Sequence, residues 1–312
     1  MGFADSTLEA VRKKQSVVVV GLDPAFDHFP PCLRPARDSP EAAARAMANF
    51  CRAIVEATAN TAVAVKPQIA FFERWGPCGL QALADVARFA KEKGLLVILD
   101  AKRGDIGSTA EAYAAAYLDT PGSGLTADAI TVNPYLGADS MEPFLRRARD
   151  SGKGLFVLVR TSNPSAAQLQ HRKLEDGAPL YEAVAKLVRE WGEQALDSSG
   201  YSNVGAVVGA TAPEQLRGVR QILPQHWLLL PGYGAQGAGP LDVVAGFDDN
   251  GAGILVNAAR SIIYAWERQR EVDPEGRNFA EAARRAAEEM RRAIMDAARA
   301  PGARSEERRN KR

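Results

Sequence analysis

Residues 97–106 read Val-Ile-Leu-Asp-Ala-Lys-Arg-Gly-Asp-Ile, an apolar run that ends in charged groups. The apolar, β-branched part predicts a buried strand, and the charges mark the point where this strand leaves the core. Side chains two positions apart share one face of a strand, so we expect Asp100 and Lys102 to point the same way. Asp105 follows in the turn that Gly104 opens.

A lysine between two carboxylates, partly shielded from water, is held as an ammonium ion and in a fixed direction. Such a lysine is a poised proton donor. A structural ion-pair network at the end of a strand would carry the same charges without doing chemistry, and this segment alone leaves both interpretations open.

The same pattern, an apolar run followed by polar or special residues, occurs eight times. Alanine-, glutamate- and arginine-rich stretches of helical period separate the runs, as in repeated βα units. We predict helices over residues 40–59, 80–93, 180–198 and 213–222. The eight expected strands cover residues 17–22, 61–66, 95–100, 129–133, 155–160, 204–209, 227–231 and 253–257.

Eight βα units close naturally into a (β/α)8 barrel, although the strand count also suits a doubly wound open sheet. In a barrel all carboxyl ends of the strands meet at one face, where the βα loops build the active site, and the polar strand ends favour this fold. No repeat or linker divides the chain, so we expect a single domain over residues 1–299. The polar residues in question are Asp23, Lys66, Asp100, Lys102, Asn133, Thr161, Ser162 and the glycine-rich stretch after Pro231.

The overall charge excludes some classes of partner. The 312 residues include 39 lysines and arginines against 38 acidic residues, a formal net charge of +1. No global attraction therefore draws the chain to nucleic acid or to an anionic membrane, and local groups must hold any anionic ligand. No apolar run approaches the length of a membrane span, and the amino terminus does not resemble a secretory signal.

Cysteine and histidine usage indicates a reducing cytoplasm and no metal centre. An odd number of widely spaced cysteines argues against a disulfide framework and against a zinc knuckle. The histidines form no ligand pair, so we expect no transition-metal site. These residues are Cys32, Cys51, Cys78, His28, His171 and His226.

Residues 300–312 combine Pro, Gly and charged residues without aromatic side chains or an apolar period. This composition predicts a disordered tail. Its basic character would also suit an RNA-binding arm, but a solvated tail is the more frequent explanation.

A phosphate site is predicted where the last two strands end. The segment Pro-Gly-Tyr-Gly-Ala-Gln-Gly-Ala-Gly over 231–239 follows the seventh run, and Arg260 follows the eighth. Glycines allow backbone N–H groups to approach an anion, and Arg260 can donate two hydrogen bonds to it, with Gln236 bridging to a neighbouring part of the ligand. Glycines also serve turns, and the spacing does not match the dinucleotide pattern Gly-x-Gly-x-x-Gly.

Two further charged residues follow strands. Lys66 ends the apolar run Val-Ala-Val-Lys and, in a barrel, lies beside the strand that carries Asp100, although it could instead extend to solvent. This order predicts an alternating series of charges: Lys66, Asp100, Lys102 and Asp105. Asp23 could reach the same face from the first strand or could serve the turn before Pro24.

The segment Asp100-Ala-Lys102-Arg-Gly-Asp105-Ile106 resembles the Asp-x-Lys-x-x-Asp signature of the orotidine 5'-phosphate decarboxylase family. A wider suprafamily of sugar-phosphate decarboxylases and aldolases shares the short signature, but Lys66 and Gln236 favour the nucleotide decarboxylase. The matches run from the first strand to Arg260. Further segments that resemble the longer bacterial, type 2 subfamily are Val-Gly-Leu-Asp23-Pro, Val-Lys66-Pro-Gln and Asp105-Ile-Gly-Ser-Thr109.

The resemblance implies a (β/α)8 barrel that converts orotidine 5'-monophosphate (OMP) to uridine 5'-monophosphate (UMP) and carbon dioxide, the last step of de novo UMP synthesis, without a metal or organic cofactor. Lys102 would protonate C6 of the pyrimidine within a network of Lys66, Asp100 and Asp105. In this family the second aspartate of the signature enters the neighbouring subunit's site. A homodimer is therefore implied, in which Asp105 acts in trans together with Ile106 and Thr109.

The resemblance also implies how the substrate is held. Asp23 and Lys66 would contact the ribose, Ser162 and Gln236 the pyrimidine, and Arg260 with nearby backbone amides the phosphate.

The sequence departs from the shorter form of the family at two places. Gln236-Gly-Ala-Gly stands where a second glycine and an acidic residue are more usual, and Ala259 stands where glycine often precedes the arginine. Stretches 28–40 and 168–179 look like insertions and receive no task from the sequence.

Two other functions compete with the decarboxylase. A metal-assisted sugar-phosphate enzyme of the same suprafamily would use acidic residues to place Mg²⁺, and Lys66 argues against it. A non-catalytic barrel would sense a nucleotide phosphate through Arg260, with the charged series serving structure only. Replacing Lys102 by alanine separates these, since a sensor should keep ligand binding and an enzyme should lose turnover.

Overall fold

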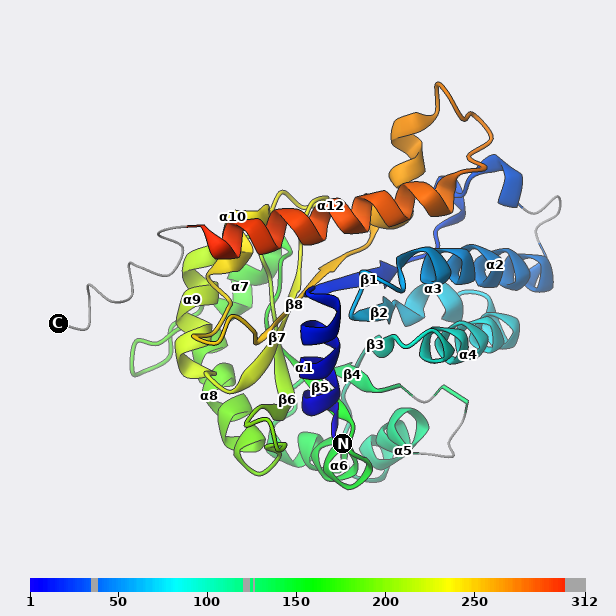
Figure 1. The fold of residues 1–312 in the computed structure, drawn as a ribbon. Helices are drawn as coiled ribbons and strands as arrows, with labels where there is room; N and C mark the ends of the chain where they lie inside the picture. The colour runs from blue at the N-terminus through cyan, green and yellow to red at the C-terminus, as the bar shows by residue number, and fades with distance from the viewer. Residues whose placement is uncertain (35–38, 120–123, 126, 301–312) are drawn as a thin grey trace.

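The computed structural model describes residues 1–34, 39–119, 124–125 and 127–300, and in it eight parallel strands form a closed barrel. Each strand pairs with the next, and β8 pairs back with β1, for example Val19 with Asn257. Closure confirms the (β/α)8 barrel and excludes the open sheet (Figure 1). The strands are β1 Val18–Leu22, β2 Ala64–Pro67, β3 Leu96–Arg103, β4 Ala129–Val132, β5 Gly154–Arg160, β6 Ser202–Val208, β7 His226–Pro231 and β8 Ile254–Ala258.

The strands are buried along nearly their whole length because barrel side chains on one face and helices on the other both exclude water. All eight predicted strands exist, with shifted ends. β2 begins only at Ala64, since the N–H groups of Thr61 and Ala62 bond back to the carbonyl of Thr58 at the end of the preceding helix. β3 continues past Asp100 to Arg103.

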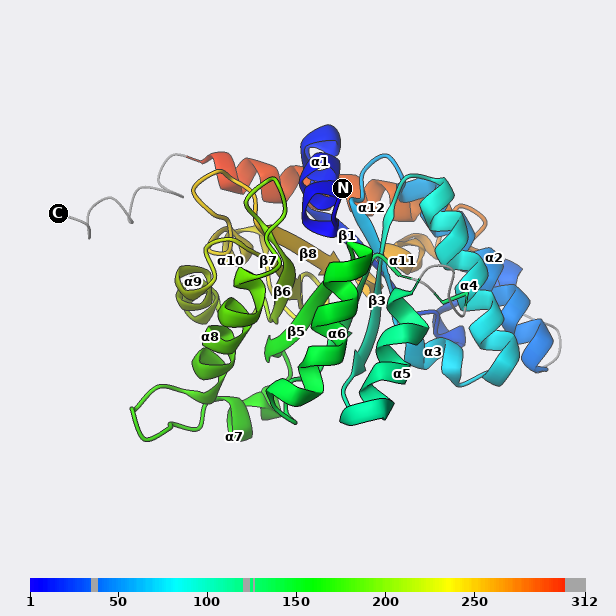
Figure 2. The same cartoon turned by 90° about the horizontal axis from the view of Figure 1, so that it is seen from below.

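The predicted helices are present and cover the outside of the barrel (Figure 2). α8 ends at Glu193, short of the predicted 198, because the carbonyl of Ala195 accepts the N–H of Asn203 and the chain turns back into β6. The helices are α1 Phe3–Lys14, α2 Pro40–Thr58, α3 Ile69–Glu73, α4 Gly76–Glu92, α5 Gly107–Leu118, α6 Ala138–Ser151, α7 Ala167–Gln170, α8 Leu180–Glu193, α9 Pro213–Ile222, α10 Pro240–Val244, α11 Arg260–Ile263 and α12 Phe279–Arg299, with short 3₁₀ turns η1 Phe26–His28, η2 Pro31–Leu33, η3 Pro164–Ala166 and η4 Ala265–Gln269.

The first helix, α1, covers the amino end of the barrel. The Ala4 N–H donates to Oδ1 of Asn203 at 2.8 Å, and the Lys14 ammonium donates to the carbonyl of Ala62 at 2.7 Å. Both partners lie at the beginnings of strands, and Phe3 packs edge-on against Phe156 with ring centroids 5.7 Å apart. The amino end is therefore closed, which leaves the carboxyl end as the open face.

The last helix, α12, lies beside α2 and so brings the C-terminal part of the chain next to the first βα unit (Figure 1). Of the residues described, no helix is long and apolar enough to cross a membrane. Apart from Ala300, the predicted tail lies outside the described residues. The stretch 168–179 carries the end of α7 and a bridge between Lys173 and Pro179.

Candidate active site

A cavity of about 450 Å³ opens at the carboxyl end of the barrel, and every strand or the loop after it contributes to its wall. Its size lies within the usual range for small-ligand sites. Seven of the ten predicted site residues line it: Asp23, Lys66, Asp100, Lys102, Ser162, Gln236 and Arg260. The remaining wall is formed by Gln68, Thr131, Leu158, Thr161, Asn163, Val207, Leu229, Pro231, Gly232, Tyr233, Ala235, Asn257 and Ala259.

One carboxylate holds two ammonium groups at the floor of the cavity. The Lys66 ammonium donates to Oδ2 of Asp100 at 2.5 Å, and the Lys102 ammonium donates to Oδ1 at 2.5 Å. Lys66 and Asp100 are buried, whereas the Lys102 side chain is 45% exposed toward the cavity mouth. Gln68 and Thr131 also donate to Asp100, each at 3.0 Å. Four hydrogen-bond donors thereby hold the Asp100 carboxylate in one orientation.

The burial and charges of this centre keep both partners ionised. Burial alone would raise the pKa of Asp100, but Lys66 and Lys102 together hold it well below its usual range. Burial alone would lower the pKa of Lys66, but the carboxylates of Asp100 and Asp23 raise it above its ordinary value. Asp100 is therefore an anion at neutral pH and orients the Lys102 ammonium at the cavity.

The backbone at Lys102 is left-handed, with φ of +49°, and the pairing of β3 with β4 shifts between Leu99 and Arg103. A non-glycine residue in this conformation costs about 1–2 kcal/mol and is found where function requires it. The N–H of Lys102 donates to Oγ1 of Thr131 at 2.9 Å, which holds the irregular turn. Asp100 and Lys102 meet as predicted, but the predicted reason, regular strand geometry, is wrong.

Two acceptor atoms in the cavity wall are left without hydrogen-bond partners among the described residues: Oδ1 of Asp23 and Oδ1 of Asn257. Burial raises the pKa of Asp23. Buried polar atoms normally have partners, so these two indicate donors on a ligand, such as hydroxyl groups. They lie at the ends of β1 and β8, which are neighbours in the barrel.

The glycine-rich loop after β7 turns back on itself beside Arg260. Gly232, Gly234 and Gly237 have φ of +105°, +74° and +98°, which other residues rarely adopt. Gln236 and Arg260 both line the cavity. Arg260 forms no ion pair with any described residue, so its guanidinium is free to bind an anion.

Comparison with known proteins identifies the family. The model of the orotidine 5'-phosphate decarboxylase / HUMPS family matches residues 16–273. The chain belongs to this family. It is similar to the orotidine 5'-phosphate decarboxylase of Rhodopirellula baltica, with 47% identity over 277 residues that cover 86% of this chain and 90% of the relative.

Longer matches and a solved structure agree with this result. The orotidine 5'-phosphate decarboxylase of Roseiflexus castenholzii is 43% identical over 306 residues, which cover 96% of this chain and all, 100%, of the relative. The structure of Leishmania donovani OMP decarboxylase matches with a TM-score of 0.74 at 35% identity and covers 96% of this chain and 100% of its own. The chain is therefore similar to these enzymes along nearly its whole length.

The first two charged residues of the family signature, Asp100 and Lys102, line the cavity, but its second aspartate does not. Asp105, Ile106 and Thr109 do not line the cavity formed by the described residues. Oδ1 of Asp105 accepts the N–H of Ile106 at 2.8 Å, and the Ile106 side chain is 57% exposed. In the single chain the series of charges thus ends at Lys102.

Three residues of the charged floor and wall, Gln68, Thr131 and Asn257, were not predicted as site residues. Gln68 could have been found from the sequence, because it stands two positions after Lys66. In the structure a backbone bridge pairs it with Asp100. Asn133, predicted among the polar strand ends, does not line the cavity, because it lies beyond β4 and its Oδ1 accepts the N–H of Tyr135 at 3.1 Å.

Proposed function

We propose that the cavity decarboxylates OMP to UMP and carbon dioxide, with Lys102 as the proton donor to C6. The activity follows from membership of the family and places the chain among the carboxy-lyases, at the last step of UMP synthesis. The observation that carries the residue assignment is the buried Asp100 carboxylate between two ammonium groups that line the cavity, of which the Lys102 ammonium belongs to the more exposed side chain.

The chemistry requires such a group. Loss of carbon dioxide from C6 leaves an electron pair in the plane of the pyrimidine ring, where the ring carbonyls delocalise it poorly. A fixed positive charge beside C6 stabilises this pair in the transition state, and a site that needs no rearrangement does so best. The Lys102 ammonium supplies the charge and then the proton. Asp100 and Lys66 hold it in place.

The rest of the substrate is assigned to the other walls. Arg260 and the glycine-rich loop bind the phosphate, and Ser162 with Gln236 contacts the pyrimidine. Asp23 and Lys66 contact the ribose, and the unpartnered oxygens of Asp23 and Asn257 support hydroxyl binding on that side. Binding energy from the distant phosphate can serve the chemical step, so removal of the phosphate should reduce more than affinity.

We propose that the active unit is a homodimer in which Asp105 of each subunit completes the partner's site. Within one chain Asp105 stays outside the cavity, and Lys102 has Asp100 as its one carboxylate partner among described residues. Apolar side chains in the segments after the neighbouring strands β3 and β4 are exposed: Ile106 at 57%, Tyr135 at 74% and Leu136 at 49%. Exposed large apolar side chains at the ends of adjacent strands suit an interface with a second copy.

Mixing inactive variants tests the dimer. Dimers of Lys102→Ala alone or Asp105→Ala alone should be inactive, whereas a refolded mixture should regain about one quarter of wild-type activity, because half the dimers are mixed and each restores one of two sites. Lys102→Ala mixed with Asp100→Ala is the matched control and should regain none, since those residues act in the same chain. No recovery in either mixture would place Asp105 in its own chain's site.

The activity itself is tested by the ultraviolet absorbance of protein mixed with OMP and EDTA, with Lys102→Ala beside it. Rapid conversion that depends on Lys102 is expected. Loss of activity in EDTA would favour the metal-assisted sugar-phosphate enzyme, and OMP binding without turnover would favour the sensor.

The free cysteines, Cys32, Cys51 and Cys78, support our inference that the enzyme works in the cytoplasm.

A further inference from the structure

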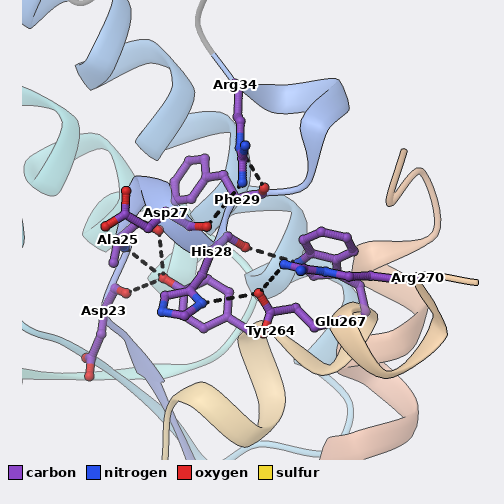
Figure 3. A network of polar contacts seen from close by, with 10 residues as sticks. Asp23, Ala25, Asp27, His28, Phe29, Arg34, Tyr264, Glu267 and Arg270 are labelled. Carbon is purple, nitrogen blue, oxygen red and sulfur yellow. Dashed lines mark hydrogen bonds and ion pairs between the residues drawn. The ribbon is translucent and has the colours of Figure 1, made fainter. Parts of the chain in front are cut away.

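We propose that Tyr264 is a positioning residue that sets the direction of the Asp23 carboxylate and links it to Arg260. Tyr264 does not line the cavity and was not predicted from the sequence. The proposal rests on the proposed function, which places Asp23 and Arg260 on the substrate. It assigns a role to a polar network that joins the loop after β1 to the segment after β8 (Figure 3).

The Tyr264 hydroxyl holds both sides of the turn at Pro24. It donates to the carbonyl of Asp23 at 2.6 Å and accepts the N–H of Ala25 at 2.7 Å. Figure 3 shows the Asp23 carboxylate pointing away from this contact. Oδ1 of Asp23 has no hydrogen-bond partner among the described residues, so the direction of this side chain depends on the backbone that carries it and on the charge of Lys66.

Tyr264 is itself rigidly held. The side chain is 5% exposed, and its ring stacks on Phe50 with centroids 5.8 Å apart and packs at a tilt against His28 with centroids 4.9 Å apart. Nδ1 of His28 lies 3.1 Å from Oε1 of Glu267, and Nε1 of Trp266 donates to the His28 carbonyl at 3.2 Å. Burial raises the pKa of Tyr264 well above its usual value, so the hydroxyl keeps the proton that it donates.

The same residue is tied to the phosphate side of the cavity. The N–H of Tyr264 donates to the carbonyl of Arg260 at 3.2 Å, so Arg260 and Tyr264 stand at the two ends of the single helical turn α11. One end of this turn carries Arg260, and the other end carries the hydroxyl that bonds the backbone on both sides of Pro24. This path connects the groups assigned to the two ends of the ribose phosphate.

The test is Tyr264→Phe, which keeps the ring and removes the hydroxyl. We expect kcat/KM for OMP to fall at least tenfold, mainly through a higher KM. Tyr201→Phe is the matched control, since the Tyr201 hydroxyl bonds Asp248 near the closed amino end and the side chain is 6% exposed. Tyr201→Phe should lower the melting temperature by about as much as Tyr264→Phe does, but it should change kcat/KM less than twofold.

A merely structural role is separated by repeating the substitution in an Asp23→Asn background. If Tyr264 acts through Asp23, Tyr264→Phe should change kcat/KM less than twofold in the Asp23→Asn background. A tenfold loss of kcat/KM in both backgrounds overturns the proposal. An unchanged kcat/KM in Tyr264→Phe or in Asp23→Asn overturns it as well. Absence of turnover in the wild type would reject the proposed function instead.

A second variant covers the case in which Tyr264→Phe does not fold. His28→Ala removes the ring that packs on Tyr264 from a side chain that is 46% exposed, so it should fold normally. We expect a two- to fivefold decrease in kcat/KM, again dependent on Asp23. The same kcat/KM as the wild type would count against the proposal.

Discussion

At the scale of single residues, Lys102 combines an uncommon backbone conformation with the central charge of the site. We expect Lys102→Ala to fold, because the substitution removes no buried group, and to lower kcat by at least about 10³-fold, because the fixed charge and the proton donor are both lost. Steady-state absorbance with OMP gives kcat, and titration calorimetry with UMP gives binding, which should persist through Arg260 and the loop after β7.

The matched control is Lys153→Ala. The Lys153 ammonium lies 3.3 Å from Oδ1 of Asp128, and the residue precedes β5, away from the cavity. It should leave kcat unchanged. An equal loss in both variants would remove Lys102 from the chemical step.

The buried pair of Lys66 and Asp100 makes a prediction about stability. Lys66→Met leaves the buried carboxylate with one ammonium in place of two, and removal of one partner from a buried pair costs about 3–5 kcal/mol. Urea unfolding at pH 7 should show a decrease of this order in the free energy of unfolding. Lys93→Met is the control: its pair with Glu56 is exposed at 33% and 58%, and such pairs contribute less than about 1 kcal/mol. Similar losses in both would show that burial of the pair is unimportant.

Local sequence was sufficient for residues that end a strand with an unusual charge, such as Lys66, Asp100 and Asp23, since a charge at the end of an apolar run needs an explanation. It was insufficient for Thr131 and Asn257. A threonine or asparagine in a strand also satisfies ordinary packing, and only the closed barrel shows that these two face the cavity.

At the scale of elements, the stretch 168–179 contributes Gln170, which holds Thr161 of the cavity wall in place. Oε1 of Gln170 accepts the N–H of Thr161 at 2.9 Å, and Nε2 donates to Oγ1 of the same residue at 2.8 Å. Thr161 in turn donates to Asn163 at 2.7 Å, and both line the cavity. Gln170→Ala should therefore raise KM for OMP roughly tenfold, because small displacements of binding groups are costly.

The control for this prediction is Gln225→Ala. The Gln225 amide donates to the carbonyl of Gly200 at 3.1 Å, a single exposed contact that precedes β7 at the amino end. Steady-state kinetics should give a wild-type KM for it. A wild-type KM in Gln170→Ala would mean that α7 does not support the site.

Ala259, which stands where the shorter form of the family often has glycine, packs against Gly21 of the neighbouring strand β1. A Cβ on Gly21 would lie 2.7 Å from Cβ of Ala259 and 3.2 Å from Oδ1 of Asn257. Gly21→Ala should lower the free energy of unfolding by about 1–3 kcal/mol through overpacking between β1 and β8.

Ala259→Gly removes the closer of these contacts, so the double variant should recover part of the loss in urea unfolding. Losses that simply add would show that the two positions do not interact. The Asn257 contact remains in the double variant, so recovery should be incomplete.

The sequence pattern predicted which elements exist better than it predicted the residues at which they begin and end. Strands were recognisable because parallel strands buried on both faces are continuous apolar runs, but hydrogen bonds between elements set their ends. The start of β2 and the end of α8 both depend on such bonds, to Thr58 and to Ala195. The irregular end of β3 depends on Thr131, a residue of another strand.

At the scale of the whole molecule, the repeat of eight apolar runs with polar ends was enough to predict the barrel and the face that carries the site. The closed amino end was not predicted, because α1 is an ordinary amphipathic helix whose place depends on distant partners such as Asn203. That end also contains His226, which takes no part in the site and is 3% exposed.

His226 predicts how the stability of the molecule depends on pH. Burial, with smaller contributions from the charges of Arg220 and Arg189, lowers the pKa of His226 to about 4, whereas an unfolded histidine titrates near its ordinary 6.5. Between these values the unfolded chain binds a proton that the folded chain does not. Unfolding is therefore favoured as pH falls from about 6.5, and the loss is complete near pH 4. Its full size is about 3 kcal/mol.

Urea unfolding at pH 7.5, 6, 5 and 4.5 measures this slope. His226→Gln should be less stable at pH 7.5 but should flatten the dependence, whereas His28→Gln, at an exposed position, should keep the wild-type slope. Asp100 does not interfere, because its lowered pKa makes its contribution fall only as pH drops below about 3.8. The same slope in His226→Gln and in the wild type would mean that His226 is not the group that titrates, and the acid sensitivity would then have to arise from another part of the barrel.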